Sequence, residues 1–368
     1  MKYRQNELYH EQSLDNTGTK IIDLNFKDPL SALGLQFAGV NGATSNKGNW
    51  MSDVITKIEI VDGSDVLGSL SLKQAQALQS HQTGKMPYIN FEEGAAKGGK
   101  DEVMLLFGRY LWDGEYYLDL TKFSNPQLKI TTDEDVIRAI GADGWSDGSF
   151  KVSITAFIIQ EGAAAAKGFF MNKEVYNFTA AATGDEHIDL PRDYPYVGLM
   201  LSSTIKQSDI YELVSKMKIS CDSDKFIPIN QYTNHYLEQY ENERDPLSMR
   251  CVLWRKDGEE PQFPIYYNPR ANLMASGRGH ICNSGWMWSG NMNFMLTDDD
   301  GGAVAAEEQI WAHITGGSLH CSLYVPFGLL ADPESYFPTA DWNEIKLILT
   351  QAGAGAVKTC LQQLRPFV

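Results

Sequence analysis

An internal repeat constrains this chain more than any other feature, because a sequence that resembles itself folds into two similar units. At an offset of 166 in residue number (176 minus 10), the segment His10–Pro29 aligns with the segment Tyr176–Pro195. A Thr-Gly pair, an Ile-Asp-Leu run and a proline coincide at this one offset, which the alternation common to β-rich segments does not explain. The identities pair Thr17, Gly18, Ile22, Asp23, Leu24 and Pro29 with Thr183, Gly184, Ile188, Asp189, Leu190 and Pro195.

A second stretch repeats at an offset of 159 (212 minus 53), where Asp53–Leu78 aligns with Glu212–Leu237. The identities pair Lys57, Ile60, Ser64, Asp65 and Leu78 with Lys216, Ile219, Ser223, Asp224 and Leu237. Between the two stretches the first copy contains AGVNGATSNKGN, a loop composition that tolerates the implied insertion. A length of 368 residues also suits two domains. We therefore expect two copies of one β-sandwich, at residues 8–165 and 170–368.

Short blocks of alternating apolar residues, bounded by Gly, Asn, Asp, Ser or Pro, predict many strands. These blocks are VITKIEIV (54–61), VMLLFGRYL (103–111), YYLDL (116–120), VSITAFII (152–159), VGLMLSS (197–203), KMKISC (216–221), CVLWR (251–255), GSLHCSLYV (317–325) and IKLILT (345–350). The pair Asp62-Gly63 between two such blocks predicts a hairpin.

Helical signals are few. The run 71–81 places Leu72, Ala75 and Leu78 on one face, with Ser71 as N-cap. A second candidate, 208–217, merges into a strand-like run. A doubly wound α/β fold needs a helix between successive strands, so the pattern favours antiparallel β-sandwiches.

Three Gly-rich stretches are expected to be connections. GAAAAKG at 162–168 predicts a linker, with a short surface helix as the alternative. The acidic stretches 141–149 and 297–302 predict solvated turns, because neither has the spacing of oxygen ligands found in a calcium loop.

The second copy resembles the opening of the second jelly roll in double jelly-roll major capsid proteins, the lineage of tectiviruses, corticoviruses and adenoviruses. The elements that carry the resemblance are Ile188–Pro191, strands at Leu199–Ser202 and Val214–Ser220, a turn at Asp222–Lys225 and a helix at Tyr232–Tyr240. The first copy is similar through Ile22-Asp23-Leu24, the turn at Ser64-Asp65 and the helix at Leu72–Leu78. The Trp-, Met-, Asn- and Gly-rich region 261–302 does not follow the family pattern, and we expect a loop on the outer surface there.

The resemblance implies an all-β fold of two tandem eight-stranded jelly rolls with a few short helices. It further implies a non-catalytic major capsid protein of a bacterial virus, whose pseudo-hexagonal homotrimers tile an icosahedral shell. The implied partners are other copies of the chain, further capsid proteins such as vertex proteins, and an internal membrane near the N-terminal segment. The implied location is the virion, after synthesis in the host cytoplasm.

The charge balance agrees with such a role. The chain has 47 acidic and 31 basic residues, a formal net charge of -16, so strong direct binding of nucleic acid is not expected. No apolar run approaches the roughly 20 residues of a membrane span, and the first residues lack a signal-peptide pattern, which together predict a soluble protein. Five widely spaced cysteines predict free thiols, and we interpret the sequon Asn177–Thr179 as chance.

Jelly rolls also occur in cupins and in carbohydrate-active proteins, so their chemistry must be considered. A metal site built from His280, Cys282, His313, His320 and Cys321 lacks the standard spacings, and hydrogen-bonded strand histidines are favoured instead. The short glycine runs at Gly277 and Gly353 do not form phosphate-binding motifs. The adjacent carboxylates are Glu92-Glu93, Glu259-Glu260 and Glu307-Glu308, and neighbours on a strand point to opposite faces.

The aromatic residues Trp286, Trp288 and Phe294 leave one alternative function open. They could stack on sugar rings, which would make the chain a two-sandwich carbohydrate-binding or carbohydrate-active protein. We favour packing at a protein interface, where aromatic anchors are common. No catalytic residue, cofactor site or metal site is therefore assigned.

Overall fold

The computed structural model describes residues 2–42, 50–91, 96–134, 145–203, 209–255, 265–266, 272–277, 281–288, 291–297 and 308–367. The first half contains β1 (Lys2–Ser13), β2 (Thr17–Asp23), β3 (Leu30–Val40), α1 (Met51–Val54), β4 (Ile55–Asp62), β5 (Asp65–Leu70), α2 (Leu72–Thr83), β6 (Ile89–Phe91), β7 (Gly98–Leu106), η1 (Leu120–Lys122), β8 (Pro126–Asp133) and β9 (Lys151–Glu161).

The second half repeats this order and adds strands to it. It contains β10 (Gly168–Ala180), β11 (Asp185–Asp189), β12 (Tyr196–Ser203), α4 (Ile210–Leu213), β13 (Val214–Cys221), β14 (Phe226–Tyr232), α5 (Thr233–Asn242), β15 (Leu247–Arg255), β16 (Ile265–Tyr266), β17 (Asn272–Gly277), β18 (Ile281–Trp288), β19 (Asn291–Thr297), β20 (Glu308–Gly316), β21 (Ser318–Leu319), β22 (Ser322–Pro326), η3 (Pro333–Ser335), η4 (Thr339–Asp341), β23 (Ile345–Gln351) and β24 (Gly355–Pro366).

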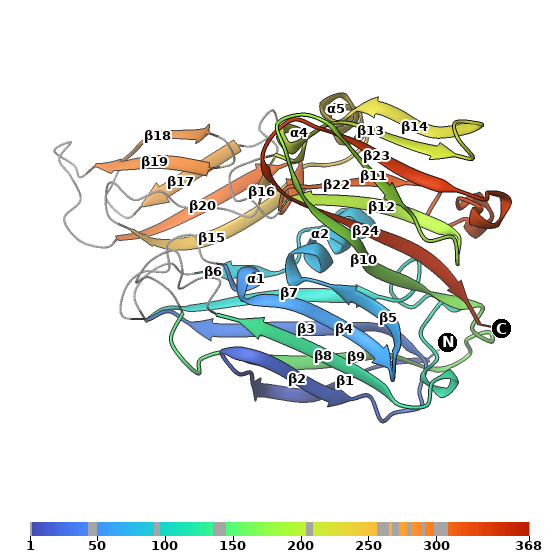
Figure 1. Cartoon of the computed structure of the whole chain (residues 1–368). Helices are drawn as coiled ribbons and strands as arrows, with labels where there is room; N and C mark the ends of the chain where they lie inside the picture. The colour runs from blue at the N-terminus through green and yellow to red at the C-terminus, as the bar shows by residue number, and fades with distance from the viewer. Residues whose placement is uncertain are drawn as a thin grey trace.

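The two halves have the same sheet topology. In the first half the sheets run β1-β9-β3-β7-β6 and β2-β8-β4-β5, and in the second half they run β10-β24-β12-β22 and β11-β23-β13-β14. Each half is thus a jelly-roll sandwich of eight equivalent strands, to which the first half adds the short edge strand β6, and we call the halves the first roll and the second roll. A parallel contact between β5 and β10, at Ser69 and Lys173, joins one sheet of each roll into a larger sheet. Figure 1 shows the rolls packed side by side with α2 between them.

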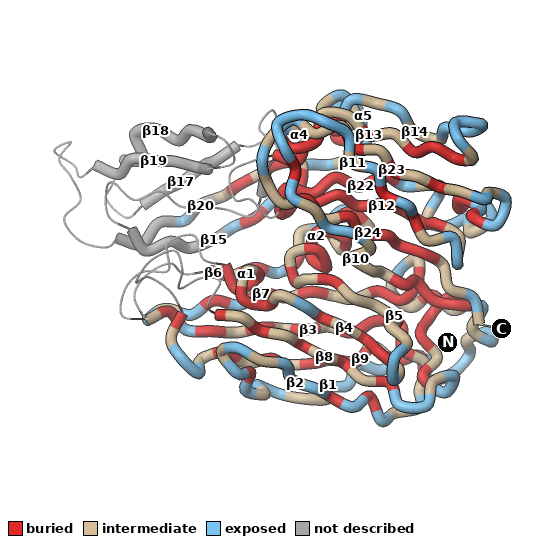
Figure 2. The backbone as a smooth tube through the Cα atoms, viewed as in Figure 1, coloured by how far each residue is buried: buried red, intermediate tan, exposed pale blue. Residues whose placement is uncertain are grey.

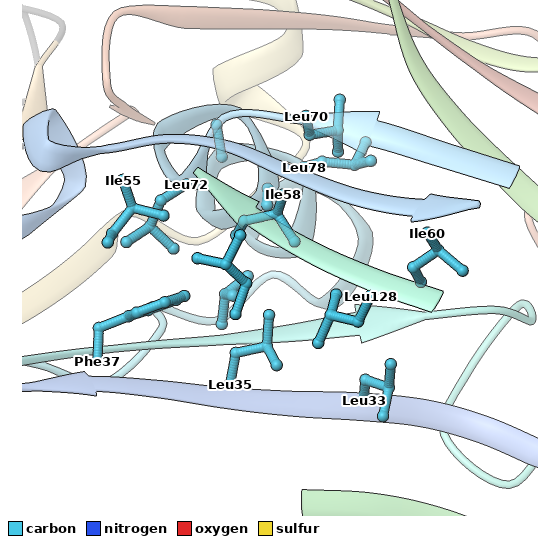
Figure 3. Packing of buried hydrophobic residues seen from close by; sticks show 14 of the residues in the cluster. Leu33, Leu35, Phe37, Ile55, Ile58, Ile60, Leu70, Leu72, Leu78 and Leu128 are labelled. Atoms are coloured by element: carbon cyan, nitrogen blue, oxygen red, sulfur yellow. The ribbon is translucent and has the colours of Figure 1, made fainter. Parts of the chain in front are cut away.

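Alternation builds the core of the first roll. Leu33, Leu35 and Phe37 of β3 point inward, and Gly34 and Gln36 between them do not. Figure 3 shows the inward side chains of β3 meeting those of β4, β5, β8 and α2. The buried cluster then continues into Met200, Tyr324 and Cys360 of the second roll, so the first core and the contact between the rolls are continuous. Figure 2 shows this as buried backbone that runs through the middle of the molecule.

The repeat is confirmed at the level of individual residues. Strands β4 and β13 begin at Ile55 and Val214, an offset of 159 (214 minus 55), and the short helices before them keep this offset at both ends. Strands β3 and β12 begin at Leu30 and Tyr196, an offset of 166 (196 minus 30). The hairpin at Asp62-Gly63 is confirmed, with Gly63 at a φ of 61°.

The later halves of the rolls also match, although their sequences alone did not show it. Gly34 pairs with Met104, and its equivalent Met200 pairs with Tyr324, which gives an offset of 220 (324 minus 104). The connection from β14 to β22 is therefore longer than the connection from β5 to β7 by 220 minus 159, or 61. Strands β15 to β21 lie in this connection, and Figure 1 shows most of them at the end of the molecule away from both chain termini. The region 261–302 belongs to it.

Most predicted strands and helices are present, and five predictions need correction. The region 261–302, expected to be a loop, contains strands β16 to β19, and the block 103–111 is a strand only as far as Leu106. The block 116–120 is not a strand, because Tyr116 and Leu118 make only isolated bridges. The block 317–325 is split by a turn in which His320 and Cys321 have φ values of 54° and 49°. The helix predicted at 208–217 ends at Leu213, where β13 takes over.

The connections behave largely as predicted. The linker interpretation of 162–168 is confirmed, because no helix forms between β9 and β10. The backbone N–H groups of Ala164 and Lys167 instead donate to the carbonyls of Gly114 and Glu115. In the acidic stretch 141–149, residues 145–149 are described and contain an exposed turn at Asp147-Gly148, with Gly148 at a φ of 70°, as predicted. The stretch 297–302 lies outside the described residues except for Thr297.

Substituting Leu35 with Ala tests the packing of the first roll. Leu35 is 1% exposed, so Leu35→Ala should lower the free energy of unfolding by roughly 2–5 kcal/mol through lost burial and the cavity left behind. Ile21 on β2 is 54% exposed, and Ile21→Ala should change it by no more than about 0.5 kcal/mol. Urea unfolding followed by tryptophan fluorescence measures both. Equal effects of the two substitutions would contradict the placement of β3.

Candidate functional site

Helix α2 forms the centre of the contact between the rolls. Ser71 caps its N-terminus: the Ser71 hydroxyl accepts from the Gln74 N–H at 3.3 Å, and the Gln74 side chain accepts from the Ser71 N–H at 2.7 Å. Gly84 ends the helix in the left-handed conformation, with φ at 67°. Between these caps the helix packs on β7 of its own roll and on β21 and β22 of the second roll.

His81 at the end of α2 is buried against the second roll. Its ring nitrogens lie 3.1 Å from the Tyr240 hydroxyl and 3.0 Å from the Ser322 hydroxyl. Because Ser322 donates its only hydroxyl proton to the Leu319 carbonyl, it must accept from the Nε2–H of His81. Nδ1 of His81 then accepts from Tyr240, so the partners select one neutral tautomer.

Aromatic rings and an arginine enclose this histidine. The Tyr324 ring stacks on the His81 ring with centroids 5.4 Å apart. The Arg244 guanidinium lies 4.6 Å from the centre of the Tyr240 ring and donates to the His81 carbonyl. Burial, with a smaller contribution from the positive charge of Arg244, lowers the pKa of His81 to about 3. The imidazole therefore stays neutral at neutral pH.

A second polar cluster, formed around Gln76 and His320, lies nearer the N-terminus of α2. Nε2 of His320 donates to the Gln76 side chain at 2.7 Å, and Gln76 donates to the Glu102 carbonyl at 3.2 Å. Burial, followed by the charge of Lys73, lowers the pKa of His320 to about 3. Burial, together with the charge of Asp53, raises the pKa of the Asp101 carboxyl to about 7.

Charged groups complete the contact at its edge. Arg365 of β24 makes a bidentate ion pair with Asp65 of β5, at 3.0 and 2.7 Å. The Gln74 side chain donates to Glu174 of β10 at 2.7 Å, and Lys358 pairs with the same carboxylate at 3.1 Å. The contact therefore joins the two rolls through complementary shapes and complementary polar groups.

The loops after β7 and β22 carry a further sequence signal of the repeat, one that neither of the two offsets reveals. Both begin with Phe-Gly, at Phe107-Gly108 and Phe327-Gly328, and both continue with Asp-x-Glu-x-Tyr. These residues are Asp113, Glu115 and Tyr117 in the first roll and Asp332, Glu334 and Tyr336 in the second. A Cβ on Gly108 would lie 2.2 Å from a carbonyl oxygen, and one on Gly328 would lie 2.5 Å from another, so both loops need glycine.

These equivalent loops also contact each other. Arg109 is held by the buried Asp113 through two hydrogen bonds of 2.7 and 2.8 Å, and its remaining nitrogen donates to the Ala331 carbonyl at 3.2 Å. The hydrogen bonds from Arg109 help to keep the pKa of Asp113 below its ordinary value although burial opposes this. One arginine therefore links the two rolls at this end.

The described histidines considered for a metal site have protein partners. His313 bonds the Ser248 hydroxyl at 2.7 Å, and His320 bonds Gln76, so both are hydrogen-bonded histidines as favoured from the sequence. Burial raises the pKa of the Cys321 thiol well above its ordinary value. His280 lies outside the described residues, and so does the side chain of Cys282. Among the residues that the structure describes, no group of three metal-binding side chains occurs.

The other sequence candidates are mostly beyond the described residues. Both members of the carboxylate pairs at 92–93 and 259–260 are outside them, as is Glu307. Trp286 lies on β18 opposite Asn293 of β19, and Phe294 lies on β19 opposite Gly285, with their side chains not described. Gly353 forms part of the turn between β23 and β24.

Substituting Asp101 with Asn tests the buried carboxyl. Its folded pKa of about 7 exceeds the ordinary 3.8, so its contribution to stability is fully present below pH 3.8 and is lost as the pH rises through 7. Asp101→Asn cannot ionise and should raise the free energy of unfolding at pH 8 by roughly 1–3 kcal/mol, with little change at pH 4.

The measurement is urea unfolding of wild type and variant at each pH, with Asp185→Asn on the exposed β11 as the control. His81 and His320 act in the opposite sense, because their lowered pKa values remove stability as the pH falls below 6.5. Comparing variant and wild type at one pH cancels that contribution. A variant that is less stable at pH 8 and unaffected at pH 4 would contradict the buried neutral carboxyl.

Comparison with known proteins gives structural matches only. No protein-family model matches the chain, and no curated sequence matches it. The STIV MCP aligns over 100% of this chain and 97% of its own, at 11% identity and a TM-score of 0.61. The major capsid protein P2 from bacteriophage PM2 aligns over 100% of this chain and 98% of its own, at 10% identity and a TM-score of 0.54. VP54 of PBCV-1 aligns over 99% of this chain and 93% of its own, at 9% identity and a TM-score of 0.56.

The described part of the chain contains no helix long and apolar enough to span a membrane. Its two rolls share the same topology, equivalent strand registers and equivalent loops after β7 and β22. Its fold matches the solved capsid proteins over its whole length. The chain therefore has the double jelly-roll fold, as the sequence predicted.

Proposed function

We propose that this chain is the major capsid protein of an icosahedral virus, with a structural and non-catalytic role. The observation that carries the proposal is the pair of topologically identical jelly rolls, joined in one chain that aligns end to end with the major capsid protein P2. Fold alone does not define function. The step from this fold to a capsid role is supported because two similar rolls in one chain are suited to tiling a shell.

Two similar rolls in one chain suit a shell built from trimers. A homotrimer of such chains presents six similar sides, which lets equal contacts repeat around a nearly hexagonal unit. We place the rolls at residues 8–165 and 170–368, on either side of the linker between Glu161 and Gly168. The long connection between β14 and β22 suits the outer surface of the shell, because it lies at the end away from the termini (Figure 1).

The remaining partners follow from this orientation. The end that carries both termini would face the shell interior, where the N-terminal strand could meet an internal membrane, and vertex proteins would contact the trimers laterally. A net charge of -16 leaves the genome to other proteins. The chain would be made in the host cytoplasm and reside in the virion.

The solution mass of the purified chain at neutral pH tests the proposal. We expect a stable trimer near three times 41.1 kDa, which sediments as one species and resists dilution. Sedimentation velocity over a range of concentrations measures this. A monomer that binds glycans would instead support the carbohydrate-binding alternative and contradict the capsid role.

Deleting residues 1–8 tests the membrane contact. These residues include much of β1, which pairs with β9 and is tied to Glu161 by the Lys2 ammonium at 2.7 Å. If the N-terminal strand meets a membrane, the truncated trimer should lose flotation with anionic lipid vesicles that the full chain shows. Flotation that is absent from the full chain would contradict the contact.

A further inference from the structure

The two buried histidines that the structure describes both lie at the contact between the rolls. His81 is 3% exposed and His320 is 5% exposed. His81 belongs to the first roll and is hydrogen-bonded by the second, whereas His320 belongs to the second roll and is hydrogen-bonded by the first. The other described histidines are exposed or half-buried, and they are His10, His187, His235 and His313. Because histidine gains its charge in a range close to neutral pH, acidification acts on this contact.

The hydrogen bonds of His81 fit the neutral imidazole. Its Nε2–H donates to the Ser322 hydroxyl, and its Nδ1 accepts from the Tyr240 hydroxyl. A proton added at Nδ1 would turn this acceptor into a donor, so the Tyr240 hydroxyl would lose the acceptor of its own proton. The ring of Tyr324 on β22 stacks on the imidazole, and burial raises the pKa of that phenol, which therefore stays uncharged. Protonation of His81 thus costs a hydrogen bond in a buried site.

The charged groups around His81 add to this cost. The Arg244 guanidinium, in the segment after α5, donates to the His81 carbonyl. Lys85, in the segment after α2, lines a cavity of about 460 Å³ that reaches His81, and Asp245 lines the same cavity. Glu241 of α5 is a buried carboxylate on this side. Burial and then Arg244 lower the pKa of His81 to about 3, so the positive charge of Arg244 outweighs these carboxylates.

His320 crosses the contact in the other direction. It lies in the turn between β21 and β22 with a φ of 54°, and its Nε2–H donates to the Gln76 side chain of α2. Lys73 of α2 and Asp53 of α1 are the charged groups that act on it. Burial and then Lys73 lower the pKa of His320 to about 3, although Asp53 opposes them. A proton on this ring therefore places a positive charge near Lys73 of the other roll.

The rest of the structure responds differently to acid. The core of the second roll consists of apolar and aromatic side chains such as Leu199 and Leu347. The first core contains Asp101, whose raised pKa makes its contribution more favourable as the pH falls towards 3.8. At the edge of the contact, Asp65 and Glu174 have lowered pKa values, so their ion pairs weaken only below the ordinary values of 3.8 and 4.5. The histidines weaken the contact earlier, as the pH falls below 6.5.

We propose that the contact between the rolls is an acid-sensitive joint, which opens on mild acidification while each sandwich keeps its own core. The linker at 162–168 keeps the rolls in one chain, and the bond from Arg109 to the Ala331 carbonyl ties them at the same end. Opening uncovers the face of the second roll that carries Tyr324 and Cys360. The inference goes beyond the proposed function, because the joint lies within a single chain.

Three buried cysteines report which surface opens. Cys360 packs in the cluster shared with the first roll, Cys321 lies near Lys73 of the first roll, and Cys221 lies in the core of the second roll. A pulse of 4,4′-dithiodipyridine, which reacts with thiols in acid, labels them between pH 7 and pH 4. Mass spectrometry of the peptides then gives each labelling rate, normalised to that of a free thiol at the same pH.

We expect Cys321 and Cys360 to react roughly tenfold faster or more at pH 5 than at pH 7, while Cys221 stays protected. Each histidine that is protonated only in the open form shifts the opening equilibrium by up to about tenfold per pH unit below 6.5. Labelling of Cys221 together with the other two would show that the second roll unfolds as a whole, and would overturn the joint. An unchanged labelling rate between pH 7 and pH 5 would do the same.

Replacing the histidines tests their role. A glutamine amide can donate and accept as a neutral imidazole does but does not titrate, so His81→Gln/His320→Gln should bring the ratio of rates at pH 5 and pH 7 close to one. The ratio within one variant cancels any loss of stability that does not depend on pH, and each single variant should show part of the effect. The matched control, His10→Gln/His187→Gln, replaces two exposed histidines and should keep the wild-type ratio. A double variant that retains the acid response would overturn the proposal.

The outcomes are independent of the proposed function. Sedimentation at pH 7 decides whether the chain forms trimers, and labelling decides whether the joint opens. A monomeric chain whose Cys321 and Cys360 become reactive at pH 5 would contradict the capsid role and support the joint. A stable trimer whose cysteines remain protected down to pH 4 would support the capsid role and overturn the joint.

Discussion

The burial of α2 between two sheets is the constraint on which the arrangement of the rolls depends. A helix surrounded by protein is usually apolar on all sides. Here Leu72 and Leu78 contribute to the first core, whereas Gln76 and His81 face the second roll. Their polar atoms lose water on burial, and the cost is offset only where partners accept or donate at the right positions. The second roll supplies the partners of His81 and one of the partners of Gln76, so the burial of these two side chains is compensated when both rolls are in place.

Polar contacts at this boundary determine geometry more than they add stability. Both ring nitrogens of His81 have a partner, and the partners lie on different elements, α5 and β22. A slip of one residue along β22 would replace Ser322 by Leu323, whose side chain points into the second core. The imidazole would then lose a partner in a buried site. The hydrogen bonds therefore select one relative placement from the many that apolar packing alone would allow.

The sequence predicted the part of the fold that local chemistry determines. Thr-Gly, Ile-Asp-Leu and the turn at Ser64-Asp65 recur because both rolls need the same turns and the same inward side chains, and these positions revealed the repeat. The repeat in the later halves of the rolls was not visible in the sequence, because the connection from β14 to β22 is much longer than that from β5 to β7 and changes the offset between equivalent residues. The Phe-Gly and Asp-x-Glu-x-Tyr motifs at Phe107 and Phe327 could have revealed the match.

The candidate site was less accessible from sequence than the fold. The strand predicted at 116–120 failed because Tyr116 and Leu118 alternate like strand residues but follow a loop fixed by Arg109 and Asp113. The contact between the rolls brings together His81, Ser322 and Tyr240, which are far apart in the chain. No local pattern encodes such a meeting, and a buried histidine resembles an exposed one until its neighbours are known.

Because of the long connection between β14 and β22, some surfaces of the molecule occur once per roll and others once per chain. Outside this connection the two rolls have similar structures, so any surface built from them occurs once per roll. The connection is present in only one roll of each chain, so whatever it builds repeats once per chain. Tyr240, Arg244 and His320, near the ends of the connection, take part in the contact between the rolls, whereas β17, β18 and β19 supply none of the described hydrogen bonds of that contact. The chain can therefore diversify the features that the connection presents while the surfaces formed by the two rolls stay constant.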